Sequence, residues 1–204
     1  MEKRHFKLAQ INPDFVARQE YFFLFETAAC DKDNFISYIF VDPIKVIKVK
    51  NFQGVLEAFK QIDEYSRKYY LAGYFAYELG YYFEQESLKT KASFDYPLIH
   101  LAVFKNRFYF NHLTGKTNIN IPGIFSPKGK EQAFHISNLK FSLNPRQYQD
   151  KIHKIKSYIR SGDTYQVNFT AKYRFNFSGS ALGLYNNLMP RQSVAYGAFC
   201  KLKD

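Results

Sequence analysis

A helix with a marked start and a marked end, followed at once by a strictly alternating run, is the feature that most limits how this chain can fold. Asn144 is a helix-capping residue, Pro145 suits the first helical position, and Gln147 stands where a capping box needs it. Gly162 suits the left-handed residue that ends a helix. Between these two ends, one face of the expected helix contains Tyr148, Ile152, Ile155 and Ile159. The pattern predicts an amphipathic helix that begins at Pro145 and ends before Gly162.

The alternating run starts shortly after Gly162. Aromatic or apolar residues occupy the odd positions from Tyr165 to Phe175, and polar residues occupy the even positions between them. Because successive side chains of a strand point to opposite faces, the run predicts a long strand with one face on a core. The polar row contains Gln166, Asn168 and Thr170. Such a row could line a cleft for a polar anionic ligand or simply face solvent, and the residues alone leave both readings open.

The N-terminal part predicts paired strands and a further helix. The aromatic-rich runs 21–29 and 35–43 predict two adjacent strands. Asn51 precedes apolar residues at helical spacing, which predicts a helix of roughly four to five turns. In the run 71–84, small residues alternate with aromatic ones, and a glycine in such a strand indicates either the close approach of another backbone or a bulge.

The middle of the chain predicts a meander and then a linker. The meander consists of residues 98–104, 107–112 and 117–121, with turn residues at each bend. Residues 122–138 lose this periodicity and contain prolines and glycines, so they are the predicted linker. A short helix near Ala181 to Leu188 and a strand-like run 194–202 follow. We therefore expect a β-rich subdomain over residues 1–138 and a second domain over residues 139–204.

Composition agrees with a folded α+β protein that has large, mainly antiparallel sheets flanked by helices. The chain has 204 residues, of which 17 are Tyr and 22 are Phe, and these aromatic side chains bury large areas. The net charge of +11 arises from basic residues scattered singly, which favours a solvated surface over nucleic-acid binding. No run approaches the ~20 apolar residues that a membrane span needs, so we expect a cytoplasmic protein without membrane contact.

Neither metal nor catalytic motifs stand out. The five His residues are isolated, and Cys30 and Cys200 are far apart, so no metal site is predicted and both thiols are expected to be reduced and buried. The sequence contains no phosphate loop, dinucleotide-binding turn or nucleophile elbow. Glu78 and Asp163 have suitable groups for acid–base chemistry, but the pattern gives neither of them a partner. We assign no catalytic residue.

The junction after the helix resembles a known enzyme family. Residues 159–170 are similar to I-x-x-G-D-x-Y-Q-V-N-L-T, which opens the chorismate-binding domain of the family of aminodeoxychorismate synthase component I and anthranilate synthase component I. The signature residues of that domain are Gly162, Asp163, Tyr165, Gln166, Asn168 and Thr170.

Three upstream runs carry the same resemblance. Residues 24–28 are similar to the family's Leu-Leu-Glu-Ser-Ala, and residues 35–43 to its Tyr-Ser-Phe followed by Asp-Pro. Residues 73–80 are similar to Gly-Tyr-x-x-Tyr-Glu-x-Gly and are closer to the aminodeoxychorismate branch. The resemblance spans the chain from about residue 20 to its end, and it implies an anthranilate synthase component I-like fold that is incomplete at the C-terminus.

This resemblance implies that the chain is the N-terminal portion of aminodeoxychorismate synthase component I. The full-length family enzyme converts chorismate and ammonia to 4-amino-4-deoxychorismate with Mg²⁺ in folate biosynthesis, and a glutamine amidotransferase subunit supplies the ammonia. Anthranilate synthase component I, in tryptophan biosynthesis, is the alternative. The family's substrate, magnesium and catalytic groups would follow residue 204, so we expect these 204 residues to be inactive alone and to bind no metal. A non-catalytic effector-binding or subunit-docking module is a third reading.

The family also holds tryptophan between the Leu-Leu-Glu-Ser strand and a Pro-aromatic run. By this resemblance, the candidate effector residues are Phe25, Glu26, Thr27, Phe35, Ala195 and Tyr196. Thr27 keeps the hydroxyl of the family's serine, whereas Ala195 replaces its proline. The alternative is an aromatic-rich core without a ligand.

Overall fold

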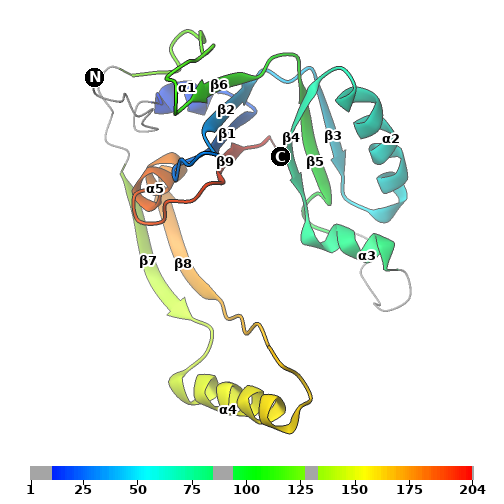
Figure 1. The fold of residues 1–204 in the computed structure, drawn as a ribbon, viewed down its shortest axis with the longest axis vertical. Helices are drawn as coiled ribbons and strands as arrows, with labels where there is room; N and C mark the ends of the chain where they lie inside the picture. The colour runs from blue at the N-terminus through cyan, green and yellow to red at the C-terminus, as the bar shows by residue number, and fades with distance from the viewer. Residues whose placement is uncertain (1–10, 85–93, 127–132, 204) are drawn as a thin grey trace. The chain divides into compact units, whose positions relative to one another are not determined.

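The computed structural model describes residues 11–84, 94–126 and 133–203. These residues form two compact units. The large unit combines Met1–Glu131 with Tyr185–Asp204, and the small unit comprises Gln132–Leu184. Figure 1 shows the elements of both units along the chain. The domain boundary predicted at residues 138 and 139 concerns family domains rather than compact units, and it stays a prediction.

The first sheet of the large unit joins the two ends of the sequence. Its strands follow the order β6-β2-β1-β9, and every neighbouring pair is antiparallel. The strands are β1 (Phe22–Glu26), β2 (Ile36–Val41), β6 (Phe108–Asn111) and β9 (Gly197–Lys201). The predicted pairing of the two aromatic runs is confirmed, since Phe22 lies opposite Val41. The predicted closing strand is also confirmed, because β9 pairs with β1.

The second sheet of the large unit has the order β3-β5-β4 and is antiparallel throughout. It consists of β3 (Lys45–Val49), β5 (Ile99–Phe104) and β4 (Tyr70–Phe75). The turn η2 (Phe52–Gly54), capped by Asn51, leads into α2 (Val55–Ser66), so the predicted helix is confirmed. Short elements complete the unit: α1 (Pro13–Arg18), η3 (Tyr77–Leu79) and α3 (Gly80–Phe83), and α5 (Ala181–Leu188) contains residues of both units.

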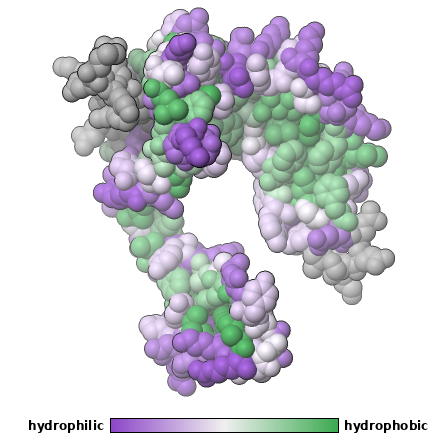
Figure 2. All heavy atoms as spheres, viewed as in Figure 1, coloured by the Kyte–Doolittle hydropathy of each residue, from purple (hydrophilic) through white to green (hydrophobic). Residues whose placement is uncertain are grey.

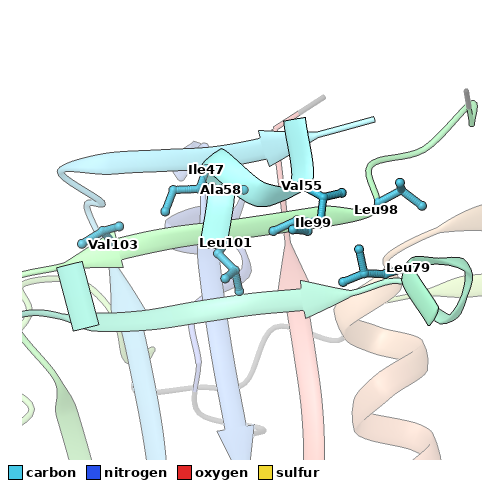
Figure 3. Packing of buried hydrophobic residues seen from close by; sticks show 8 residues of the cluster. All are labelled: Ile47, Val55, Ala58, Leu79, Leu98, Ile99, Leu101 and Val103. Carbon is cyan, nitrogen blue, oxygen red and sulfur yellow. The ribbon is translucent and has the colours of Figure 1, made fainter. Parts of the chain in front are cut away.

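Strand β5 is buried on both faces and forms the centre of the large unit. Leu101 and Val103 belong to a cluster with Val55 and Ala58 of α2, which Figure 3 shows. Ala102 and Phe104 belong to a second cluster, together with Phe23 of β1 and Phe40 of β2. Since alternate residues of a strand face opposite sides, β5 lies between the helix layer and the first sheet. These clusters are the hydrophobic core.

One sequence prediction fails in this region, and another is confirmed. The first two strands of the predicted meander are confirmed as β5 and β6, but they belong to different sheets. Residues 117–121 contribute only an isolated bridge between Thr117 and Phe110, so the third strand and the meander arrangement are wrong. Turn chemistry shows that the chain bends, but it does not show which sheet the next strand joins. The predicted close approach at Gly73 is confirmed, because an added Cβ would lie 2.0 Å from the carbonyl oxygen of His100.

The small unit consists of a two-stranded antiparallel sheet and a helix. Strand β7 (Phe134–Phe141) pairs with β8 (Tyr173–Gly179), and the register shifts between Ser137 and Lys140. Helix α4 (Pro145–Ser161) has the predicted capping box at Asn144, and Gly162 ends it in the left-handed conformation with φ 80°. This helix is confirmed with both of its ends.

The long strand predicted from Tyr165 onward is wrong over most of its length. No strand covers residues 164–172, and β8 begins only at Tyr173. Most of the residues predicted to face a core are exposed, with 93% for Tyr165 and 46% for Phe175, while Phe169 and Ala171 are half-buried. A strand needs a neighbour for its backbone hydrogen bonds, and in the described part of the chain β7 pairs only with β8. Alternation alone therefore does not make a strand here.

Four further sequence predictions can be compared with the structure. The predicted linker is partly wrong, because residues 134–138 belong to β7, while residues 127–132 lie outside the described ranges. Cys30 and Cys200 are free but exposed, so their predicted burial is wrong. The α+β class with antiparallel sheets is confirmed. Across the described ranges, each helix falls short of the length and apolar character that a membrane span requires.

Candidate functional site

The best-defined candidate site is a group of buried polar side chains at one end of β1 and β2, which we call the polar cluster. It contains Glu26, Thr27 and Ser37, which are 7%, 5% and 2% exposed, together with His112 and Tyr185, whose side chains bond to this group. All of them lie in the large unit. Buried polar groups are costly unless they are hydrogen-bonded, so their partners define what this site can do.

Glu26 occupies the last position of β1, opposite Gly197 of β9. The Tyr185 hydroxyl donates a hydrogen bond to Oε2 of Glu26 over 3.2 Å. A Cβ atom at Gly197 would lie 2.9 Å from this hydroxyl and 3.1 Å from Cε of Met189. Glycine at position 197 therefore leaves the room that Tyr185 needs to reach Glu26. The Tyr185 ring also packs edge-on against Phe199, with 5.7 Å between the ring centroids.

Burial controls the charge of this carboxyl group. It raises the pKa of Glu26 to about 7, although the hydrogen bond from Tyr185 acts in the opposite direction. Burial, and next the charge of Glu26, raise the pKa of Tyr185, which stays a neutral donor. Near neutral pH, Glu26 is therefore a buried carboxyl group that can take up a proton or pair with a cationic group.

The other half of the polar cluster ties β1 to β2 and to the end of β6. The backbone N–H of Thr27 donates to Oγ of Ser37 over 3.0 Å, and Oγ1 of Thr27 donates to the carbonyl oxygen of Ile36. Ser37 Oγ also lies 2.7 Å from Nε2 of His112. Because these groups are bonded to one another, this half of the cluster holds the strand ends together.

The structure brings only some of the predicted effector residues together. The carbonyl oxygen of Val194 accepts hydrogen bonds from the N–H groups of Ala28 and Ala29, so the segment before Ala195 and Tyr196 runs beside the end of β1. Ala195 is half-buried. Tyr196 is 85% exposed, and its hydroxyl donates to Oδ1 of Asn34.

The two phenylalanines of the predicted effector set are placed differently. Phe25 lies on the opposite face of β1 from Glu26 and packs against Phe23 and Phe40, with ring centroids 6.2 and 6.0 Å apart. Phe35 is half-buried, and its carbonyl oxygen accepts the N–H of His112. The effector set therefore divides between the polar cluster and the aromatic core.

The predicted signature residues of the substrate domain lie in the small unit. After Gly162, the N–H of Asp163 donates to the carbonyl oxygen of Tyr158, and the Asp163 carboxylate accepts the hydroxyl of Ser161. These bonds close the end of α4 and turn the chain. The remaining signature residues are all exposed, and they are Tyr165, Gln166, Asn168 and Thr170.

Local contacts hold the signature segment. Nε2 of Gln166 donates to Oδ1 of Asn168 over 3.4 Å, so two members of the row bond to each other. The Phe169 ring packs against Tyr148 of α4 with 5.8 Å between centroids. The apolar side of the segment is therefore attached to the exposed apolar face of the helix.

Sequence reasoning missed three members of the polar cluster, Ser37, His112 and Tyr185, and it missed Gly197, which leaves room for Tyr185. Tyr185 is 159 positions from Glu26 in the sequence, so no local pattern could pair the two residues. Gly197 was the one available signal, because a glycine within a strand often makes room for a neighbouring group.

The described ranges contain no group of three or more His, Cys, Asp and Glu side chains placed to hold a metal ion. They therefore offer no set of ligands that fits the magnesium implied by the resemblance, and we derive no step through that ion.

Comparison with known proteins identifies the family. The sequence profile of the chorismate binding enzymes matches residues 20–204. The chain belongs to the chorismate binding enzyme family. This agrees with the expectation drawn from the signature segment and the three upstream runs.

Individual relatives carry two different names. The chain is 27% identical over 135 residues to anthranilate synthase component 1 of Saccharolobus solfataricus, which covers 66% of this chain and 32% of the relative. It is 28% identical over 80 residues to aminodeoxychorismate synthase component 1 of Escherichia coli, which covers 39% of this chain and 17% of the relative. A third relative, anthranilate synthase component 1 of Aquifex aeolicus, is 24% identical over 165 residues, and the match covers 65% of this chain and 33% of the relative. The chain spans a third or less of the length of these relatives.

Proposed function

We propose that the chain is the N-terminal portion of an aminodeoxychorismate synthase component 1. In this proposal the whole protein converts chorismate and ammonia to 4-amino-4-deoxychorismate with Mg²⁺, and a glutamine amidotransferase subunit supplies the ammonia. The family match over residues 20–204 supports the use of chorismate. The observation that carries the choice of product is the run 73–80, which resembles the aminodeoxychorismate branch.

Two residues of that run have defined contacts in the structure: its first glycine, Gly73, and its glutamate, Glu78. Gly73 lies against the backbone of β5, where the carbonyl oxygen of His100 excludes any Cβ. The Glu78 carboxylate accepts a hydrogen bond from Tyr96, and this bond raises the pKa of Tyr96. Gly73 therefore has a packing role within β4, and Glu78 has a hydrogen-bonding role in η3, which follows that strand.

The small unit supports the proposal in a different way. Its signature segment and strand β8 expose aromatic and aliphatic side chains, and Figure 2 shows hydrophobic surface on the part of the molecule that holds α4. The exposed side chains include Leu139, Tyr148, Tyr158, Ile159, Tyr165, Tyr173 and Phe175. A face of this kind is normally covered by more protein. We propose that the remainder of a chorismate-binding domain covers it, and that these 204 residues alone show no turnover.

The product of the reaction tests the proposal. The whole polypeptide encoded by the gene is incubated with chorismate, ammonia and Mg²⁺, and the products are separated by liquid chromatography. We expect 4-amino-4-deoxychorismate, with no anthranilate. Anthranilate as the product would instead support anthranilate synthase component 1, the alternative favoured by the names of two of the relatives.

The third reading is a non-catalytic module, and binding measurements separate it from the enzyme. A module predicts no turnover from the whole gene product but a measurable heat when the chain is titrated with tryptophan or with a glutamine amidotransferase subunit. Turnover by the gene product would contradict this reading.

Tryptophan binding at the polar cluster is a second candidate function. The observation that favours it is the buried carboxyl group of Glu26, which lies beside a segment that leads to Ala195 and Tyr196. A carboxylate in such a place suits the ammonium group of an amino acid. Calorimetric titration tests it: Glu26→Gln should abolish the heat of tryptophan binding, while the exposed control Glu57→Gln should retain it. Equal heats from both variants would contradict it.

A further inference from the structure

A hollow of about 490 Å³ lies in the large unit between the start of β4 and the turn that joins β5 to β6. Tyr70, Lys105, Arg107 and Asn118 are among the residues that line it, and none of its lining residues belongs to the polar cluster. The volume falls within the range of small-molecule sites.

Arg107 is held in one orientation by two tyrosine rings. The centre of its guanidinium group lies 4.9 Å from the ring centroid of Tyr38 and 5.0 Å from that of Tyr70. A cation–π contact of this kind involves the charge of the guanidinium group, which has five N–H donors. Within the described ranges no carboxylate forms an ion pair with Arg107. Its N–H donors are therefore available to an anion from outside the chain.

The surroundings of Arg107 have one sign of charge. Lys105 is on the same turn, and the lining contains no Asp or Glu. A second hollow of about 510 Å³ in the same unit differs in this respect, because its lining includes both signs, with Arg18 and Lys45 beside Glu20 and Asp42. Unopposed cations around a concave surface attract anions, whereas mixed charges do not select for them.

The backbone of this turn is fixed by a neighbouring loop. Oδ1 of Asn118 accepts the N–H of Tyr109 over 2.7 Å, and Nδ2 of Asn118 donates to the carbonyl oxygen of Arg107 over 3.0 Å. One amide side chain thus fixes the backbone on both sides of Phe108, directly after Arg107. Since the site is already ordered, little conformational entropy is lost when a ligand binds.

We propose that this hollow, which we call the Arg107 hollow, is a binding site for a small anionic molecule that carries a carboxylate or a phosphoryl group. The guanidinium edge of Arg107 donates to two oxygens of the anion, and Lys105 adds a second positive charge. The two tyrosine rings fix the direction of the guanidinium fork. The site is separate from the polar cluster, and it does not depend on which product the enzyme makes.

Nuclear magnetic resonance tests the proposal on the whole chain. The Nε–Hε signal of Arg107 is followed during titration with inorganic phosphate, and separately with benzoate, at constant ionic strength. We expect a saturable shift with at least one probe. A shift with phosphate alone assigns the site to phosphoryl groups, a shift with benzoate alone assigns it to carboxylates, and a shift with both assigns it to either group.

Matched variants connect the binding to the proposed residues. Arg107→Gln should raise the dissociation constant of the bound probe by about tenfold or more, because a charge-assisted pair is lost. Arg18→Gln removes the same charge from the hollow of mixed charge and should leave binding unchanged. Tyr70→Leu should weaken binding by a smaller factor, since Arg107 loses one supporting ring. Absence of a saturable shift with both probes, or equal weakening by Arg107→Gln and Arg18→Gln, would overturn the proposal.

Discussion

The two compact units of this chain contain similar apolar side chains, but the large unit buries many of them and the small unit leaves most of them exposed. In the large unit, Phe22, Phe23 and Phe104 are completely buried, and Phe23 and Phe104 pack against each other between the two sheets. In the small unit, residues 133–181 include no buried residue, although β8 alone contains Tyr173, Phe175 and Phe177. The difference teaches that an aromatic, alternating sequence becomes a core strand only where another layer covers it.

The small unit also shows that a helix and a strand differ in how their backbone hydrogen bonds are satisfied. Helix α4 forms with its capping box and its left-handed glycine although its apolar face is exposed. The residues that follow it alternate strictly but remain without strand pairing as far as Lys172. A helix satisfies its hydrogen bonds within itself, whereas a strand depends on a neighbour.

The largest expected effect comes from truncating matched phenylalanines in the two units. Phe104→Ala removes a ring that packs against Phe23 and Phe40, and it should lower the free energy of unfolding by about 3–5 kcal/mol. Phe177→Ala removes a ring that is 40% exposed, and the loss should be about 1 kcal/mol or less. Urea unfolding followed by circular dichroism measures both. Similar losses for the two variants would mean that the units do not differ in their packing.

Glycine substitutions provide the second comparison. Gly73→Ala would place a Cβ 2.0 Å from the carbonyl oxygen of His100 on the neighbouring strand β5. Backbone strain and overpacking together should cost about 3 kcal/mol. Gly162→Ala also needs a positive φ, but it has open space, so the cost should be about 1 kcal/mol. Thermal unfolding of both variants checks this order, and a larger loss for Gly162→Ala would contradict it.

The pH dependence of stability tests the polar cluster of the large unit. The pKa of Glu26 in the folded state is raised to about 7, so the folded state holds this proton more tightly than the unfolded state does. Stability should therefore fall as pH rises from about 4.5 to about 7, by up to about 3 kcal/mol.

The matching variants isolate this titration. Glu26→Gln should remove the fall in stability, and Glu57→Gln on the exposed face of α2 should keep it. The measurement is the urea midpoint at about pH 5 and about pH 8 for each protein. A fall of the same size in Glu26→Gln would show that other groups cause it.

The smallest expected effect concerns the start of α4. Asn144→Ala removes the oxygen that accepts the N–H of Gln147, and it should cost the helix about 1 kcal/mol. Hydrogen exchange in α4 should accelerate, while exchange in β5 stays unchanged because that strand belongs to the other unit. Equal acceleration in both elements would show that the units unfold together.

The features of the fold that could be predicted from the sequence are those that depend on residues close together in the chain. The helix ends at Asn144 and Gly162, the pairing of the first two strands and the close approach at Gly73 depend on neighbouring residues, and all were predictable. The separation of β5 from β6 into two sheets and the failure of the strand after Tyr165 depend on pairing between segments that are distant in sequence. Local patterns carry no information about such partners.

The candidate site divides in the same way. Glu26 and Thr27 could be found through the resemblance, because they lie in one short run. Tyr185 and Gly197 reach them only through the pairing of β9 with β1, which joins the two ends of the sequence. The stacking of Arg107 between Tyr38 and Tyr70 likewise combines three separate segments. No spacing within one run could have indicated either arrangement.

Native-state hydrogen exchange of the whole chain tests the central claim most directly. The claim is that covered strands, rather than alternating sequences, form the ordered sheet of this protein. Amides of β5 should show the greatest protection, those of α4 an intermediate level, and those of residues 165–171 almost none. Protection of residues 165–171 at the level of β5 would contradict the account.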